Sequence, residues 1–170
     1  MATASKSTAK KPAATARAAK TDATVMLERD HAEVRKLFKQ YEKLADAEAD
    51  GEERQALATQ ICTMLTVHAT IEEEIFYPAA REAEVEDDLL DEAEVEHASA
   101  KDLIAQIQSM SPDDELYDAK VTVLGEYIDH HVQEEEGEMF PKCRSAGMDL
   151  AGLAGQLAER KSELMAEEPA

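Results

Sequence analysis

Apolar and polar positions follow one another along the chain with the period of an α-helix. Leu27, His31, Val34, Phe38 and Tyr41 are spaced by 4, 3, 4 and 3 residues, so they share one face of a helix over roughly 22–46. The same spacing recurs in three later segments. Their inward positions are Leu57, Ile61, Met64, His68, Glu72, Ile75 and Ala79, then Leu90, Ala93, His97, Lys101 and Ile104, and then Leu116, Lys120, Leu124, Tyr127, His131, Glu135 and Met139.

Local signals indicate where these helices begin and end. The candidate caps for the first helix are Thr21, Asp22 and Thr24. Ser111 followed by Pro112 is a strong start signal for the fourth helix. Pro78 is expected to kink or end the second helix. Asp149 is a candidate cap for a short last helix.

Four helices of similar length, with connections near residues 47–52, 83–88 and 109–114, predict an all-α fold. Short connections favour an up-down-up-down four-helix bundle, in which each helix runs antiparallel to the next. We expect three parts: a disordered basic N-terminal tail over 1–20, the bundle over 21–146, and a short C-terminal fifth helix over 147–170 that packs on or beside the bundle.

Charge is divided unevenly along the chain. The first 20 residues carry five basic side chains and no acidic one, and the whole chain has a net charge of −20, so residues 21–170 carry −25. A body this acidic repels nucleic acid and anionic membranes but can hold cations. Whether the basic tail contacts an anionic partner stays open, as does the oligomeric state.

Cellular location is inferred from what the sequence lacks. No apolar run approaches the roughly 20 residues that cross a bilayer, and the first 20 residues have no apolar stretch typical of a secretory signal. Cys62 and Cys143 lie far apart, without the CxxC spacing of a redox or zinc site. We therefore expect a cytoplasmic protein with reduced thiols and no membrane partner.

Four of the five histidines fall on the predicted inward faces, one on each helix: His31, His68, His97 and His131. An inward face covers about a third of a helix surface, so chance would place all four there about one time in a hundred. Glu72 and Glu135 each follow a histidine by four residues, and such side chains stack on one helix face about 5–6 Å apart. Since a buried carboxylate without a partner is costly, these six residues predict a cation site.

The chain also repeats itself. RDH at 29–31 precedes HATIEEEIFYP at 68–78, and VEH at 95–97 precedes HVQEEEGEMFP at 131–141. Each half supplies two histidines and one glutamate, which favours two metal ions bridged by Glu72 and Glu135. Imidazole and carboxylate donors suit Fe, Mn or Zn better than Mg or Ca.

These motifs resemble those of the hemerythrin family, in particular the bacterial hemerythrin-like (HHE cation-binding) domains. The matching residues are Asp30-His31, His68 with Glu72 and the following FYP, Glu96-His97, and His131 with Glu135 and the following MFP, over roughly 22–142. The resemblance implies a four-helix bundle with two Fe ions in an oxo- or hydroxo-bridged centre, Mn and Zn being the alternatives. It also implies binding or sensing of a small molecule such as O2, NO or peroxide, or sensing of iron.

Five residues around the expected centre have open roles. Oxygen-carrying relatives usually have a second histidine one turn after the third-helix ligand, and here this position is Lys101, which cannot ligate when protonated. Tyr127, one turn before the fourth-helix histidine, is a candidate replacement ligand or an ordinary core tyrosine. His130 is expected at the surface or beside the ligands. Glu73 and Glu136 are candidates to accept a proton from the far nitrogen of a ligand histidine.

Three functions fit these observations to different degrees. The first is a hemerythrin-like di-iron protein that binds O2 or another small ligand, although the departure on the third helix argues against a pure oxygen carrier. The second is a di-iron oxidase, ferroxidase or peroxide-consuming enzyme, because ExxH motifs at Glu28 and Glu94 also match ferritin-like proteins. That pattern would leave His68 and His131 unused. The third, a metal-free interaction protein, would leave the inward charges unneutralised. No catalytic residue is assigned.

Overall fold

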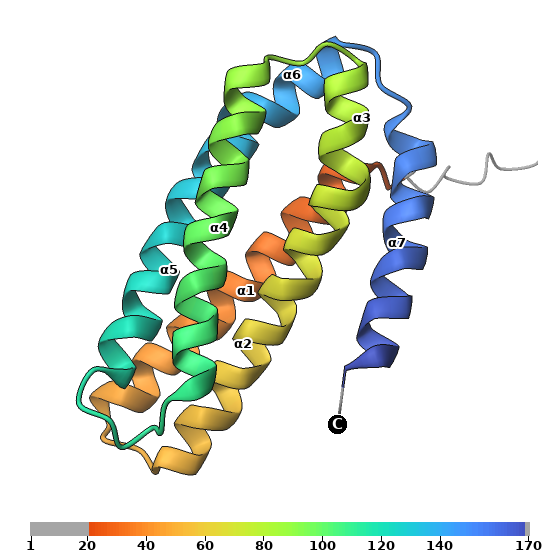
Figure 1. Ribbon diagram of the computed structural model, residues 1–170. Coiled ribbons are helices and arrows are strands. Elements are labelled where there is room, and N and C mark those ends of the chain that lie inside the picture. Colours follow the sequence, from red (N-terminus) through yellow and green to blue (C-terminus); the bar gives the residue numbers. More distant parts are fainter. Residues whose placement is uncertain (1–20, 169–170) are drawn as a thin grey trace, which may run out of the picture.

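The computed structural model describes residues 21–168, so the expected tail over 1–20 lies outside the described residues. Four long helical segments run antiparallel to their neighbours and form a bundle, with a fifth helix along its side (Figure 1). The first and third segments are single helices, α1 (Ala23–Asp46) and α4 (Asp87–Ser109). The predicted all-α, up-down-up-down bundle with a C-terminal fifth helix is confirmed.

The second and fourth segments each contain a short stretch of π-helix. The second consists of α2 (Gly51–Ile71), η1 (Glu72–Phe76) and α3 (Tyr77–Glu82), and the fourth of α5 (Tyr117–Glu134), η2 (Glu135–Met139) and α6 (Phe140–Ser145). In both, the residue after the π-turn donates its N–H to the carbonyl five residues earlier, Tyr77 to Glu72 and Phe140 to Glu135. Pro78 therefore does not end the second helix, which continues to Glu82.

The fourth helix begins later than the Ser111–Pro112 signal predicts. These residues lie in a series of turns, where the Ser111 N–H donates to the Asp114 carboxylate at 2.9 Å, and α5 begins only at Tyr117. Asp side chains compete in this way with the backbone bonds of a first helical turn. As a result Leu116, predicted to face inward, is 59% exposed.

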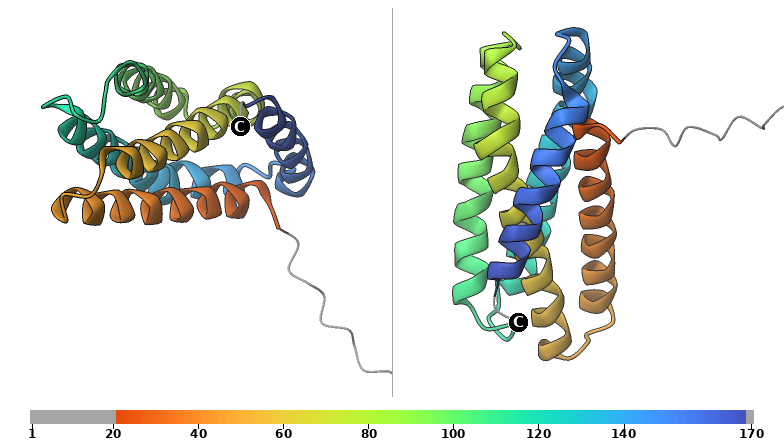
Figure 2. Two further views of the ribbon diagram at one scale, coloured as in Figure 1. Left: turned by 90° about the horizontal axis from the view of Figure 1, so that it is seen from below. Right: turned by 90° about the vertical axis from the view of Figure 1, so that its right-hand side faces the viewer.

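The C-terminal helix α7 (Leu150–Glu167) is 18 residues long and is capped by Asp149, which accepts the Gly152 N–H at 3.0 Å. It packs against α1, α2 and η1. Figure 2 shows it crossing obliquely over this side of the bundle. Leu153 and Leu157 are its buried anchors.

Buried apolar residues form two separate clusters. The first core cluster lies toward α3 and α6 and includes Leu27, Ile71, Phe76, Leu90, Phe140 and Leu157. The second core cluster lies toward the α1–α2 and α4–α5 connections and includes Val34, Ile61, Ile104, Val121 and Leu124. Along each long helix the inward histidine falls between residues of the two clusters. None of the helices within 21–168 has the length and apolar character to span a membrane.

Candidate metal centre

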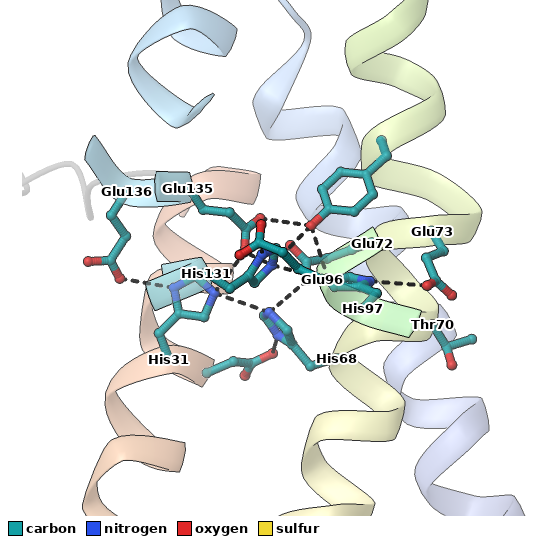
Figure 3. Close-up of polar contacts among 12 residues, drawn as sticks. His31, His68, Thr70, Glu72, Glu73, Glu96, His97, His131, Glu135 and Glu136 are labelled. Atoms are coloured by element: carbon teal, nitrogen blue, oxygen red, sulfur yellow. Dashed lines mark hydrogen bonds and ion pairs between the residues drawn. The ribbon is translucent and has the colours of Figure 1, made fainter. Parts of the chain in front are cut away.

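The layer between the two core clusters is polar and buried. His31, His97 and His131 are at most 6% exposed, and Glu72 and Glu135 are fully buried. His68 is slightly more open, with a side chain 12% exposed. Figure 3 shows these side chains pointing toward one another, and they come from all four long helical segments. The structure thus brings together all six residues singled out as metal ligands.

Each histidine ring is hydrogen-bonded to a carboxylate through its Nδ1 atom, on the side away from the centre. The Nδ1 atoms lie 2.9–3.2 Å from carboxylate oxygens: His31 from Glu136, His68 from Asp30, His97 from Glu73, and His131 from Glu96. A carboxylate can only accept, so Nδ1 carries the proton in each ring. Every Nε2 is then left with a lone pair directed to the centre, which is the tautomer that binds a metal ion.

These lone pairs face one another in two couples. Nε2 of His31 lies 3.1 Å from Nε2 of His68, and Nε2 of His97 lies 3.1 Å from Nε2 of His131. Two lone pairs at this distance repel unless positive charge lies between them. Ligands bound to one ion at roughly 2.0–2.2 Å are about 3 Å apart when adjacent, so the spacing fits a shared ion for each couple.

Glu72 and Glu135 lie between the two couples. Glu72 Oε1 is 2.9 Å from His68 Nε2 and 3.5 Å from His97 Nε2. Glu135 Oε1 is 2.8 Å from Nε2 of His131 and 3.5 Å from that of His31. Within residues 21–168, both Glu72 oxygens and Glu135 Oε1 are buried without a hydrogen-bond donor. Orphaned buried carboxylate oxygens are costly, so this arrangement suits two bridging carboxylates.

The buried carboxylates favour positive charge within the layer. Burial lowers the pKa of His68, but the charge of Glu72 and the bond to Asp30 outweigh it and raise the pKa to about 10. Burial also lowers the pKa of His131, but the charge of Glu135 and the hydrogen bonds to Glu135 and Glu96 outweigh it and raise the pKa to about 11. Burial raises the pKa of Glu72, yet its neighbours lower it well below the ordinary value. Protons would therefore occupy the layer when no other cation does.

Tyr77 is a residue that the sequence reasoning missed. Its hydroxyl donates to Glu135 Oε2 at 3.2 Å and lies 3.2 and 3.3 Å from Nε2 of His97 and His131. Five residues on a regular α-helix turn through about 500°, which would point Tyr77 about 140° away from Glu72. The π-turn widens the helix at this place and brings Tyr77 onto the same face, as such turns often do at functional sites.

The two halves differ at this position. Counting from the two glutamates, the counterpart of Tyr77 in the second half is Phe140, five residues after Glu135. The Phe140 ring lies parallel to the His31 ring, with centroids 6.0 Å apart. One histidine couple therefore has a phenol oxygen beside it, and the other has an apolar ring.

The remaining candidates lie at the edge of the centre. Tyr127 is 48% exposed and, within the described residues, no hydrogen bond joins it to the six central side chains, so it does not take the position suggested for it. Lys101 Nζ binds both oxygens of Glu73, at 2.7 and 2.6 Å, and does not reach the ligand atoms. The His130 side chain is 66% exposed and lies 3.1 Å from Glu134.

The ferritin-like alternative fails on geometry. It requires Glu28 and Glu94 to point inward, but Glu28 pairs with Arg144 at 2.9 Å on the outside of the bundle. Glu94 is 69% exposed and lies 3.8 Å from Arg81. Neither carboxylate reaches the buried layer, so the ExxH interpretation is wrong for both motifs.

A small cavity of about 40 Å³ adjoins the histidines on the side of the second core cluster. Apart from the ring edges and the outer residues Asp30, Glu96, Lys101 and Tyr127, its lining is mostly apolar and includes Val34, Leu65, Ala100, Ile104 and Val132. A water-sized molecule needs roughly 10–15 Å³ of such space. The cavity therefore admits molecules of two or three heavy atoms.

A bundle with four inward imidazoles and two shared carboxylates defines a cation-binding helical protein. The family model for the hemerythrin HHE cation binding domain matches residues 22–143. The chain belongs to the hemerythrin HHE cation-binding domain family.

Two individual proteins are similar to this chain. A solved structure of a hemerythrin HHE cation binding domain-containing protein from Mycobacterium kansasii superposes with a TM-score of 0.71 at 24% identity, covering 86% of this chain and 88% of that one. A protein described as a DNA nickase from Nostoc sp. (strain PCC 7120) is 32% identical over 116 residues, or 68% of this chain. The chain spans 32% of the length of that relative.

Proposed function

We propose that this protein holds two iron ions and binds a small molecule such as O2, NO or peroxide at them, in a sensing or stress role. His31 and His68 would hold one ion and His97 and His131 the other, with Glu72 and Glu135 shared between them. Mixed imidazole and carboxylate donors suit iron, with Mn and Zn as the alternatives. When bound, iron supplies the redox and ligand-binding chemistry that no side chain here offers.

The observation that carries this proposal is the pair of imidazole couples. Both couples place Nε2 atoms 3.1 Å apart while each Nδ1 faces a carboxylate. A metal-free interaction protein has no use for such a layer, because buried polar groups are tolerated only when they are satisfied. The six side chains also leave coordination positions free, since each ion would receive two imidazoles and a share of two carboxylates.

The cavity supports a small ligand in particular. At about 40 Å³ it is too small for a metabolite but large enough for a diatomic gas or peroxide. Its mostly apolar lining favours uncharged molecules.

The proposal is tested by metal analysis of the purified, iron-loaded protein together with optical spectra. We expect about two irons per chain, and spectra of the reduced protein that change on addition of O2, NO or peroxide. His68→Ala should remove most of the iron, whereas His130→Ala, which changes the same residue type at the surface, should retain it. Full iron content in His68→Ala would refute the ligand assignment.

Peroxide consumption is a second candidate, and Tyr77 favours it. Its hydroxyl lies within 3.3 Å of two Nε2 atoms and of Glu135, so it can supply a proton at the centre. Burial and the nearby carboxylates raise the pKa of Tyr77 well above its ordinary value, which keeps the proton in place. Measuring O2 release from peroxide by the iron-loaded protein and by Tyr77→Phe separates this activity from simple binding.

Action on DNA is not part of the proposal. The Nostoc relative is about three times as long as the matched segment, and its described activity belongs to the whole protein. Residues 21–170 of this chain carry a net charge of −25, which repels a polyanion. We therefore propose a small-molecule partner. A cytoplasmic location is proposed on the separate ground that Cys62 and Cys143 lie far apart, as is typical of thiols in a reducing compartment.

A further inference from the structure

Helix α7 lies beyond residue 143, where the match to the family model ends, yet it contacts residues next to the candidate metal centre. Its Arg160 and Lys161 side chains reach back to the bundle. Arg160 binds Glu74 on η1, with its Nε 2.7 Å from Oε2. Lys161 Nζ lies 2.6 Å from Oδ1 of Asp30 on α1. Only the second contact touches a residue that holds a histidine of the centre.

A continuous set of polar contacts runs from α7 to the centre. Asp30 uses Oδ1 for Lys161 and Oδ2 for Nδ1 of His68, at 2.6 and 3.0 Å. The side chain of Asp30 is 10% exposed and that of Lys161 is 33% exposed, so this ion pair is shielded from water on one side. Shielding strengthens the pair relative to a surface salt bridge. Both Asp30 oxygens are thereby fixed, and so is the carboxylate plane that His68 faces.

Within residues 21–168, the position that corresponds to Asp30 in the second half has no such lysine, although Lys101 binds the other supporting carboxylate there, Glu73. The counterpart of Asp30 is Glu96, which holds Nδ1 of His131 at 3.2 Å. The nearest basic group to its other oxygen is His130 Nε2, 3.8 Å away on a side chain that is 66% exposed. Helix α7 therefore supports His68 in a way that its counterpart His131 lacks.

We propose that Lys161 is a positioning residue for the metal centre: by binding Asp30 it fixes the ring orientation and Nδ1–H tautomer of His68, so that α7 stabilises metal binding at the His31–His68 couple. This inference rests on the proposed metal centre. Residues that hydrogen-bond to a metal ligand orient that ligand, and loss of such a direct partner typically costs about 10–100-fold in metal affinity. Lys161 acts one contact further out, so we expect a smaller loss.

Two substitutions in α7 form a matched pair for the test. Lys161→Met keeps the length of the side chain and removes the charge, while Arg160→Met removes the neighbouring cation that binds Glu74 instead. Lys161→Arg restores a donor to Asp30. Circular dichroism first shows that each variant is folded. Zinc is the probe, because it is diamagnetic and takes the same donors.

Two readouts then report on His68. In Lys161→Met, zinc titration should show one of the two sites weakened by about three- to tenfold, below the 10–100-fold for a direct partner. Nitrogen-15 spectra of the metal-free protein should show the His68 Nδ1–H signal shifted and exchanging faster with water, with that of His131 unchanged. Arg160→Met should leave both readouts as in the wild type, and Lys161→Arg should restore most of the loss.

The outcomes separate this inference from the proposed function. Wild-type protein that binds two zinc ions, with unchanged affinity and unchanged His68 signal in Lys161→Met, would overturn the role of Lys161 and leave the centre standing. Equal losses in Lys161→Met and Arg160→Met would also overturn it, because the cause would then be a loosened α7. Wild-type protein without a zinc site would overturn the metal centre, and this inference with it.

Discussion

Removing the Tyr77 hydroxyl tests whether the buried layer depends on each of its donors. Tyr77 is 4% exposed, and its hydroxyl is the donor to Glu135 Oε2. The other oxygen, Oε1, has no hydrogen-bond donor within residues 21–168. Tyr77→Phe would thus remove the donor to Glu135 Oε2 while changing little of the packing, since phenylalanine differs from tyrosine only by this hydroxyl.

The magnitude follows from the burial of Glu135. Leaving a buried acceptor unsatisfied costs about 1–3 kcal/mol, and more when it is charged, so we expect a loss of about 2 kcal/mol in the free energy of unfolding of the metal-free protein. For a chain of this size that corresponds to a fall in Tm of roughly 4–8 °C. The loss should be smaller in the iron-loaded protein, where a cation takes over part of the neutralisation of Glu135.

Tyr41→Phe is the matched control. The Tyr41 hydroxyl donates to Asp118 at 2.6 Å in the second core cluster, far from the centre. In Tyr41→Phe, Asp118 would retain its ion pair with Arg54 at 2.7 Å, and its side chain is 45% exposed. The loss in unfolding free energy should therefore be about 1 kcal/mol or less. Denaturant unfolding of both metal-free variants gives the comparison, and only Tyr77→Phe should change the spectrum of the iron-loaded protein. If Tyr77→Phe cost no more than Tyr41→Phe, the inferred dependence of Glu135 on this hydroxyl would be wrong.

Four further predictions concern side chains around the centre and in the apolar core. Glu73→Gln should lower metal affinity by about 10–100-fold, because Glu73 binds the ring of His97 directly, and Lys101→Met should lower the affinity less. Metal titration measures both affinities. A larger loss in Lys101→Met than in Glu73→Gln would contradict the geometry. Burial raises the pKa of Cys62 to about 11, and burial with Glu135 does the same for Cys143, so neither thiol should react with a thiol reagent at pH 8 until the protein is unfolded. Since the folded pKa of Cys62 exceeds its ordinary value of 9.0, its contribution to stability should be full below pH 9 and be lost as pH rises through 11. Ile104→Ala should cost about 2–5 kcal/mol in unfolding free energy and enlarge the cavity, so that ligands bulkier than O2 bind more tightly in a spectral titration.

The sequence was most informative where the helix is regular. A strict 3–4 spacing put His31, His97 and His131 on inward faces, and these residues are buried as that spacing requires. The repeat also indicated two equivalent halves. The four-residue step from His68 to Glu72 was enough to place both at one centre, since it precedes the π-turn.

The sequence was least informative where the backbone departs from that spacing. Tyr77 could not be placed from a period of 3.6, because the π-turn begins at Glu72 and shifts everything after it. The repeat nevertheless indicated that Tyr77 is unusual, because FYP in the first half aligns with MFP in the second, and only the first half has a hydroxyl at this position. Tyr127 was misplaced for a simpler reason: four residues turn through 400°, so it lies 40° from His131, which is enough to bring a long side chain to the edge. No spacing rule predicts contacts such as Lys161 with Asp30, 131 residues apart.

The polar layer also has a consequence for how the molecule unfolds. It separates the first core cluster, with α3, α6 and α7, from the second, near the α1–α2 and α4–α5 connections. Regions that share few apolar contacts open as separate cooperative units, whose amide hydrogens exchange with different protection. Ions bound to all four long helices would tie these units together. Loading the centre should therefore turn a chain whose two ends open independently into one that opens as a whole.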